Sequence, residues 1–126
     1  MNDPAILERF RQAVRERARL AERITALRDR QRLAVDRRGR RRREAALDSR
    51  LREASDSLRR CEEAIKAERP ALEAALGRVD DPDTRAVLRL YYADGHSDEQ
   101  AAERLWLSAR RVSRLRRDWL ARGVGS

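Results

Sequence analysis

The segment that follows Ser108 carries the side chains with the clearest binding chemistry. A guanidinium group forms paired hydrogen bonds with a phosphate, or with the acceptor atoms on the major-groove edge of guanine. The candidates for contact with DNA are Arg110, Arg111, Ser113, Arg114, Arg116 and Arg117. The first four lie in the first half of the segment, where base contacts are expected. The last two lie in the second half, where contacts to the DNA backbone are expected.

The spacing of the apolar residues predicts that these candidates lie on a recognition helix over residues 108–122. Ser108 is a typical N-cap, and Val112, Leu115 and Trp119 recur at the intervals of a buried helix face. The opposite arc holds Arg110, Ser113, Arg114 and Arg117, with Arg111 beside it. The alternative is a solvated basic helix whose arginines merely favour its C-terminal end. We prefer a recognition helix, because a turn and a helix cap precede it.

A short helix is predicted to begin at Asp81-Pro82, since Asp is a common N-cap and Pro a common first helical residue. It is predicted to end at Asp94-Gly95. Tyr91 and Tyr92 are adjacent and therefore point apart on this helix. We expect one of them in the core and the other half exposed.

A second short helix is predicted to begin at Ser97, with Gln100 as its capping-box partner. Trp106-Leu107 forms the turn that leads to the basic helix. The apolar residues of both short helices that are expected to face inward are Val87, Leu90, Tyr91, Ala101, Ala102 and Leu105. Two helices joined by a tight turn, with the second one basic, are typical of a helix-turn-helix DNA-binding motif.

Charge is distributed unevenly over this last third. Residues 80–107 contain three basic and seven acidic residues, a net charge of −4, and residues 108–126 contain six and one, a net charge of +5. The whole chain of 126 residues has a net charge of +9. The split assigns contact with an anionic partner to the last helix rather than to the helices before it.

Residues 1–79 predict a long antiparallel helical hairpin, or coiled-coil arm, with a loop at about residues 36–43. Apolar residues recur at intervals of three and four on both sides of that loop, with the polar residues Arg17, Gln31 and Glu68 interrupting the pattern. They are Ile6, Phe10, Ala13, Leu20, Ile24, Leu27 and Ala34 before it, and Leu47, Leu51, Ala54, Leu58, Cys61, Ile65, Leu72, Ala75 and Val79 after it. Pro70 predicts a kink or a break, with a new helix that ends near Gly77. Cys61 is expected to be a small buried apolar residue.

The expected fold is all-α: a hairpin at residues 1–79, a helix-turn-helix domain at residues 80–122 and a disordered tail at residues 123–126. Gly39 is the expected turn residue of the hairpin loop. The loop arginines fit a solvated tip, or a contact with phosphate or an acidic partner. They are Arg37, Arg38, Arg40, Arg41, Arg42 and Arg43.

The last forty residues resemble region four of bacterial sigma factors, and more closely the sigma-like RinA/ArpU-type regulators of phage late operons. The residues that carry the resemblance are Asp81-Pro82, Arg85, Val87-Leu88, Leu90, Tyr92, Asp94-Gly95, Ser97, Ala102, Leu105, Ser108, Val112, Leu115 and Leu120. The rest of the chain is similar in organisation only. The resemblance implies that residues 97–105 form a supporting helix and that residues 108–120 read DNA.

Four positions depart from that family. It often has Arg where Tyr91 stands, Trp where Asp98 stands and a β-branched residue where Ala101 stands. It usually has Gly or Asn where Trp106 stands in the turn. We expect the rings of Trp106 and Trp119 to refill the core that Ala101 leaves small. On that expectation, Trp106→Gly destabilises the domain by a few kcal/mol.

Other chemistries find little support. His96 is the only histidine and has no Cys or second His as a partner, so neither a metal site nor another cofactor is expected. The carboxylates of Asp94, Asp98 and Glu99 suit the N-terminus of a helix better than a catalytic cluster. The sequence has neither a glycine-rich phosphate loop nor a nucleophile elbow, so we do not expect an enzyme. It has no long apolar run, so we expect no membrane partner and a cytoplasmic location.

The sequence therefore predicts a transcriptional regulator of phage or prophage type that binds double-stranded DNA. Its helical arm would contact RNA polymerase or form a homodimer. Two alternatives stay open: a DNA-packaging subunit similar to a small terminase, and a helical interaction module that does not bind DNA. Light scattering separates the transcriptional regulator from the packaging subunit, because a packaging subunit forms a ring.

Overall fold

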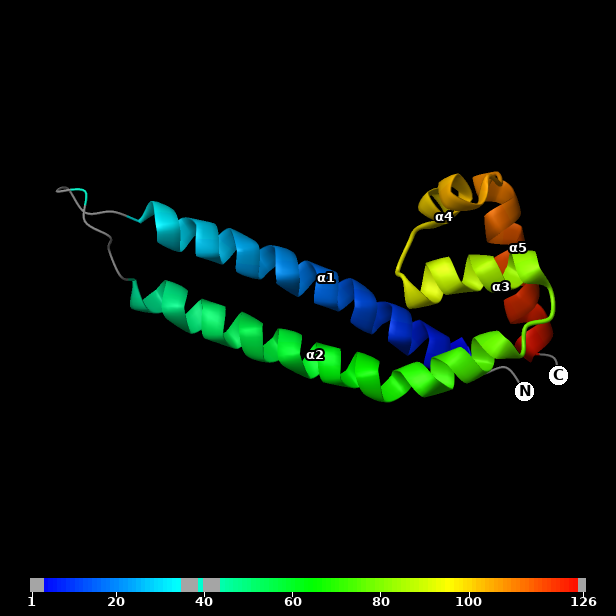
Figure 1. The fold of residues 1–126 in the computed structure, drawn as a ribbon, viewed down its shortest axis with the longest axis horizontal. Helices are drawn as coiled ribbons and strands as arrows, with labels where there is room; N and C mark the ends of the chain where they lie inside the picture. Colours follow the sequence, from blue (N-terminus) through cyan, green and yellow to red (C-terminus); the bar gives the residue numbers. More distant parts are fainter. Residues whose placement is uncertain (1–3, 35–38, 40–43, 125–126) are drawn as a thin grey trace. The chain divides into compact units, whose positions relative to one another are not determined.

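The structure, a computed structural model, describes residues 4–34, 39 and 44–124, except for the side chains of residues 123 and 124. These residues form only helices and connections, and contain no strand. The elements are α1 (Pro4–Leu33), α2 (Ala45–Gly77), α3 (Pro82–Leu88), the π-helical turn η1 (Arg89–Ala93), α4 (Asp98–Leu105) and α5 (Ala109–Val124) (Figure 1). The expected all-α fold class is confirmed.

The chain divides into two compact units. Unit 1 comprises residues 1–15 and 64–126, and unit 2 comprises residues 16–63. The boundaries cut through α1 and α2, so unit 1 contains the first turns of α1 and the last turns of α2 together with α3, α4 and α5. Helix α5 continues to Val124, two residues beyond the end expected for the recognition helix. Residues 125–126 of the predicted tail lie outside the described residues.

Unit 2 is a pair of packed helical segments. Its buried cluster consists of Ile24 and Leu27 from α1 and Leu47 and Ala54 from α2, with Leu51 and Leu58 packed against it. Gln31, near the end of α1, donates a hydrogen bond of 2.6 Å from Nε2 to Oδ1 of Asp48, near the start of α2. The two segments of this unit therefore run antiparallel.

Two residues predicted for the hairpin, Cys61 and Gly39, differ in how well the structure agrees with the prediction. Cys61 is half-buried rather than fully buried, and burial raises the pKa of its thiol. Gly39 has a φ of 75°, a left-handed conformation that suits the predicted turn residue. The six loop arginines, Arg37, Arg38, Arg40, Arg41, Arg42 and Arg43, lie outside the described residues.

Helix α2 does not break at Pro70, so that part of the prediction is wrong. Pro70 lies inside a continuous helix that ends at Gly77. A proline inside a helix costs about 3 kcal/mol, because it removes one hydrogen bond and crowds the preceding turn. Leu72 and Leu76, which follow it, are completely buried, and the guanidinium of Arg69 lies 5.3 Å from the centre of the Phe10 ring. We attribute the continuity of the helix to this packing.

Helix α3 begins as the sequence predicts. The carboxylate of Asp81 accepts hydrogen bonds from the backbone N–H of Thr84 at 3.0 Å and from its hydroxyl at 2.6 Å. Pro82 is the first helical residue. Arg85 anchors the connection before the helix, since its Nε donates to the carbonyl oxygen of Val79 at 2.9 Å.

The cap at Asp81 leads to a prediction about pH. Its hydrogen bonds with Thr84 lower the pKa of the Asp81 carboxyl below the usual value. The cap therefore stabilises the fold above the unfolded-state pKa of about 3.9, and this contribution is lost as the pH falls through the lower folded-state pKa. We expect Asp81→Ala to lower the melting temperature at neutral pH, and the deficit to shrink in strong acid. Asp80→Ala is the matched control. If the melting temperature of Asp81→Ala were lowered equally at every pH, the ionised Asp81 carboxylate would not be the cap of α3.

The end of the first predicted helix is a π-helical turn. In η1 the N–H of Asp94 donates to the carbonyl oxygen of Arg89 at 3.1 Å, and just beyond it the N–H of His96 donates to that of Leu90 at 2.9 Å. Tyr92 is buried and Tyr91 is half-buried, so one tyrosine lies in the core as predicted, but it is Tyr92 and not Tyr91, which was expected to face inward. A single π-helical turn often marks a functional site.

None of the described helices contains a sufficiently long and apolar stretch to cross a membrane.

Candidate nucleic-acid interface

Helices α3, α4 and α5 share one hydrophobic core in unit 1. Its buried members are Val87, Ala101, Ala102 and Val112, with Leu90, Leu105, Leu107, Ala109 and Leu115 packed against them. Trp119 is also buried. The inward-facing residues of all three helices were predicted from their spacing, and the burial confirms that face of α5.

The two caps that shape the α4–α5 segment are confirmed. The hydroxyl of Ser97 accepts from the N–H of Gln100 at 3.1 Å, and the side chain of Gln100 accepts from the N–H of Ser97 at 2.9 Å. The hydroxyl of Ser108 accepts from the N–H of Arg111 at 3.1 Å. These caps fix where α4 and α5 begin, and so fix which side chains of α5 point away from the core.

Four predicted contact residues lie together on the outward side of α5, and we call this surface the arginine face. It consists of Arg110, Ser113, Arg114 and Arg117, which are spaced to fall on adjacent turns of one helix side. The three arginines are exposed and Ser113 is half-buried. Among the described residues, none forms an ion pair or a side-chain hydrogen bond with these three guanidinium groups.

The other two predicted contact residues of α5 are engaged within unit 1. Arg111 is exposed and forms a 3.3 Å ion pair with Asp83 at the start of α3. Arg116 forms a two-pronged bond with Asp98, with Nε 3.2 Å from Oδ1 and a terminal nitrogen 2.9 Å from Oδ2. Arg116 and Asp98 are largely buried, with side-chain exposures of 15% and 19%. The geometry therefore separates Arg116 from the arginine face.

Arg116 belongs to a cluster that fastens α5 to the rest of unit 1. Its guanidinium lies 4.2 Å from the centre of the Tyr91 ring, and the guanidinium of Arg11 lies 3.6 Å from the same ring. Two cations thus contact one aromatic ring, an arrangement worth about 0.5 to 2 kcal/mol for each desolvated contact. The cluster connects α1, η1, α4 and α5.

Arg11 belongs to this cluster, and the sequence pattern did not indicate it. It is only 8% exposed, and one of its nitrogens donates to the carbonyl oxygen of Tyr91 and, at 2.8 Å, to that of His96. The Tyr91 carbonyl lies at the end of a helix, where carbonyl groups lack an intrahelical donor. The available signal was position, because Arg11 follows Leu7 and Phe10 on the buried side of α1.

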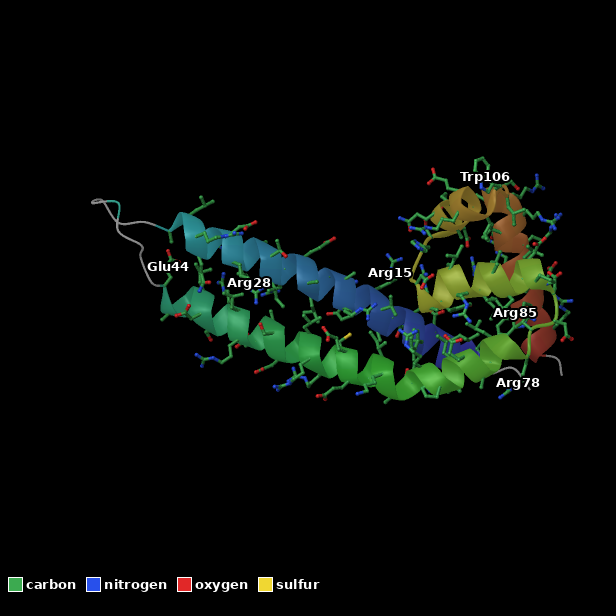
Figure 2. The ribbon with its side chains drawn as sticks, viewed as in Figure 1. Arg15, Arg28, Glu44, Arg78, Arg85 and Trp106 are labelled. Atoms are coloured by element: carbon green, nitrogen blue, oxygen red, sulfur yellow. The ribbon has the colours of Figure 1, made fainter. Side chains whose placement is uncertain are left out.

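Trp106 does not refill the core, so the prediction for this residue is wrong. Its side chain is 95% exposed, at the junction of α4 and α5 (Figure 2). Trp106 ends α4 with a φ of 57° and a ψ of 36°, a left-handed conformation that turns the chain toward Ser108. The turn directs its ring outward, whereas Trp119 on α5 is buried as expected.

This geometry reverses the expected effect of Trp106→Gly. A left-handed conformation destabilises the folded state by about 1 to 2 kcal/mol for a residue with a β-carbon, and glycine avoids this strain. Glycine also has more conformational freedom in the unfolded chain, which offsets about 0.5 to 1 kcal/mol of the gain. We expect Trp106→Gly to stabilise the protein by about 0.5 to 1 kcal/mol, measured from urea unfolding. Trp106→Ala removes the same ring but keeps the β-carbon, so it should give no such gain. Equal stability of the two variants would argue against backbone strain.

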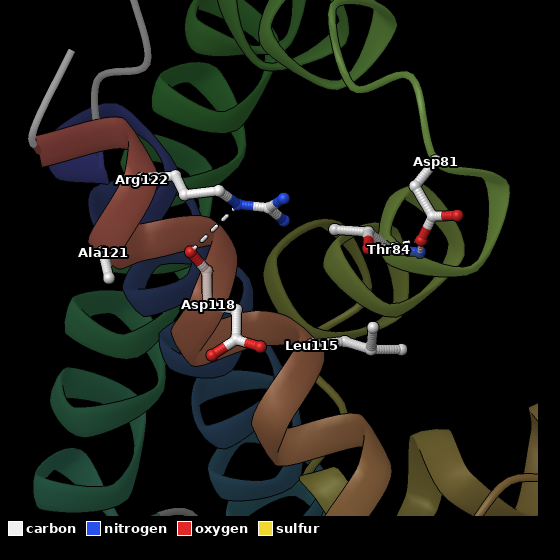
Figure 3. A pocket seen from close by; sticks show the side chains of 6 residues that line it. All are labelled: Asp81, Thr84, Leu115, Asp118, Ala121 and Arg122. Carbon is white, nitrogen blue, oxygen red and sulfur yellow. Dashed lines mark hydrogen bonds between the residues drawn. The ribbon is translucent and has the colours of Figure 1, made fainter.

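A groove of about 490 Å³ lies beside the arginine face, between the start of α3 and the second half of α5. It is lined by Asp81, Thr84, Leu115, Asp118, Ala121 and Arg122 (Figure 3). The Nε of Arg122 donates to the carbonyl oxygen of Asp118 at 3.3 Å. Two carboxylates in its wall make this groove an unfavourable place for a phosphate.

Within the described part of the chain, no three or more His, Cys, Asp and Glu side chains are grouped so that they could hold a metal ion. None of the protein-family models, curated proteins and solved structures compared with this chain matches it.

Proposed function

We propose that the protein is a sequence-specific, sigma-like transcriptional regulator that binds double-stranded DNA through the arginine face of α5. The observation that carries the proposal is the set of three exposed guanidinium groups on that face, for which the described residues supply no partner. Arg111 and Arg116, on the flanks of the same helix, are paired with Asp83 and Asp98. Three arginines without an acidic partner among the described residues are thus concentrated on a single side of the helix.

Electrostatics favours a polyanion as the partner of this face. Like charges three or four residues apart on a helix repel one another and destabilise it by about 0.2 to 0.5 kcal/mol per pair. Arg110, Arg114 and Arg117 carry this cost, and among the described residues none forms an ion pair with them. A DNA phosphate backbone would remove the repulsion and release its own counterions.

The geometry also refines which residues would do what. Arg110, Ser113 and Arg114 lie in the first half of α5, the part of a recognition helix that meets base edges. Arg117 lies one turn later, so it suits a phosphate. We assign Arg116 to positioning α5 rather than to DNA contact, because its guanidinium is held by Asp98 and Tyr91.

The helical segments of unit 2 have no role in reading DNA under this proposal. We propose that they carry a protein contact, either with RNA polymerase or with a second copy of the chain. A molar mass of a monomer or dimer, measured by light scattering, supports a regulator. A closed ring would favour a packaging subunit instead.

The direct experiment selects duplexes that bind the full chain from a random DNA pool. We expect a shared short sequence to emerge, and the recovered duplex to bind more tightly than an unrelated duplex of equal length. The affinity should fall steeply as salt is raised, with a logarithmic slope of about −0.9 for each neutralised phosphate. Recovery of no shared sequence, with no binding at low salt, would exclude the proposed function.

A further inference from the structure

We infer that Trp106 is a DNA-backbone contact, in which the indole N–H donates to a phosphate oxygen beside the N-terminus of α5. This inference rests on the proposed function and names a contact that the arginine face does not include. Four features of the residue support it: its exposure, its free donor, its backbone conformation and its position.

Exposure makes the indole available as a donor. The side chain of Trp106 is 95% exposed, and no described residue accepts a hydrogen bond from it. An indole offers a donor and no acceptor. A phosphate oxygen offers only acceptors, so the two groups are complementary. The flat ring can in addition lie against the sugar next to that phosphate.

The backbone conformation indicates that Trp106 is not there for stability. A tryptophan in the left-handed region is strained, and glycine or asparagine would make the same turn at lower cost. The ring does not offset this strain by burial, since it is almost fully exposed. Residues that cost stability without packing are concentrated at functional sites.

The position places the ring next to the proposed interface. Trp106 stands two residues before Ser108, the cap of α5. Two residues of extended chain span at most about 7 Å. An indole anchored at that distance reaches the phosphates that flank the first turn of α5, where Arg110 begins the arginine face.

Isolation favours DNA over a protein as the partner. The exposed charged residues near Trp106 in sequence are of both signs, with Glu103 and Arg104 before it and Arg110 after it. Leu33 and Trp106 are the exposed large hydrophobic residues of the described chain, and Leu33 belongs to unit 2. A protein interface needs a contiguous apolar patch. Trp106 is instead an isolated exposed ring.

The test measures the binding of Trp106→Gly and Trp106→Phe to two probes, the duplex recovered from the random pool and an unrelated duplex of equal length. Glycine keeps the left-handed turn and removes the ring. We expect Trp106→Gly to bind both probes about tenfold more weakly, because a phosphate contact is independent of sequence. Trp106→Phe, which keeps a ring but has no donor, should fall between this variant and the wild type. Leu33→Ala, which removes the other exposed large hydrophobic side chain of the described residues, should bind both duplexes as tightly as the wild type does.

The outcomes separate this inference from the proposed function. If the wild type binds neither probe, the proposed function fails. If it binds both, but Trp106→Gly binds as tightly as the wild type, the inference about Trp106 is overturned and the arginine face stands. A loss confined to the recovered duplex would also overturn it, because that result means base reading rather than a backbone contact.

Discussion

Replacing Arg110, Arg114 and Arg117 together by alanine should weaken binding to the recovered duplex by about 100-fold or more. Each arginine that binds a guanine edge through two hydrogen bonds contributes about 1 to 3 kcal/mol, and every 1.4 kcal/mol is a factor of about ten in affinity. The three side chains are exposed and unpaired within the described protein, so their removal leaves no buried group without a partner. The melting temperature should therefore stay close to that of the wild type. Fluorescence anisotropy at one fixed salt concentration measures the affinity.

A control variant separates the position of the charges from their number. Arg23, Arg28 and Arg52 are also exposed, and they lie in unit 2. Changing these three to alanine removes the same total charge. We expect this variant to lose only a little affinity, because its lower net charge weakens the long-range electrostatic attraction to DNA. Equal losses in the two triple variants would mean that net charge, and not the arginine face, governs binding.

Arg11→Ala should destabilise the protein by about 2 to 4 kcal/mol. The change leaves the carbonyl oxygens of Tyr91 and His96 without their donor, and a buried acceptor without a donor costs about 1 to 3 kcal/mol. It also removes the cation that contacts the Tyr91 ring at 3.6 Å. For a chain of this length, we expect the melting temperature to fall by about 10 °C.

Arg15→Ala is the matched control for Arg11. Arg15 lies one turn later on α1 and is exposed (Figure 2). Its guanidinium donates one long hydrogen bond, of 3.5 Å, to the carbonyl oxygen of Gly95. Its loss should change the stability by less than about 0.5 kcal/mol. If both variants were as stable as the wild type, the cluster around Tyr91 would have no role in holding α5.

Local signals predicted the beginnings of the helices well. Asp81, Ser97 and Ser108 cap helices because a short polar side chain reaches an N–H group three residues ahead, which depends only on neighbouring residues. The inward side of α5 could also be predicted, since Val112 and Trp119 are placed by helix periodicity alone.

Long-range geometry decided the features that the sequence did not reveal. Arg116 and Arg117 are adjacent and chemically identical, but only Arg116 reaches Asp98, 18 residues away. Arg11 meets its acceptors across 80 and 85 residues. Trp106 was expected to refill the core volume that Ala101 leaves small, whereas the left-handed turn directs its ring outward. In each case the side chain's surroundings are set by how the helices pack.

The most direct test of the central claim is the ratio of affinities for the recovered duplex and for an unrelated duplex. It should be measured for the wild type and both triple-alanine variants at one salt concentration. For the wild type we expect a ratio of about 10³ or more, which is typical of specific DNA-binding proteins. The variant that lacks Arg110, Arg114 and Arg117 should lose most of this ratio, whereas the variant that lacks Arg23, Arg28 and Arg52 should keep it. An unchanged ratio in the first variant would contradict the claim that the arginine face of α5 reads DNA.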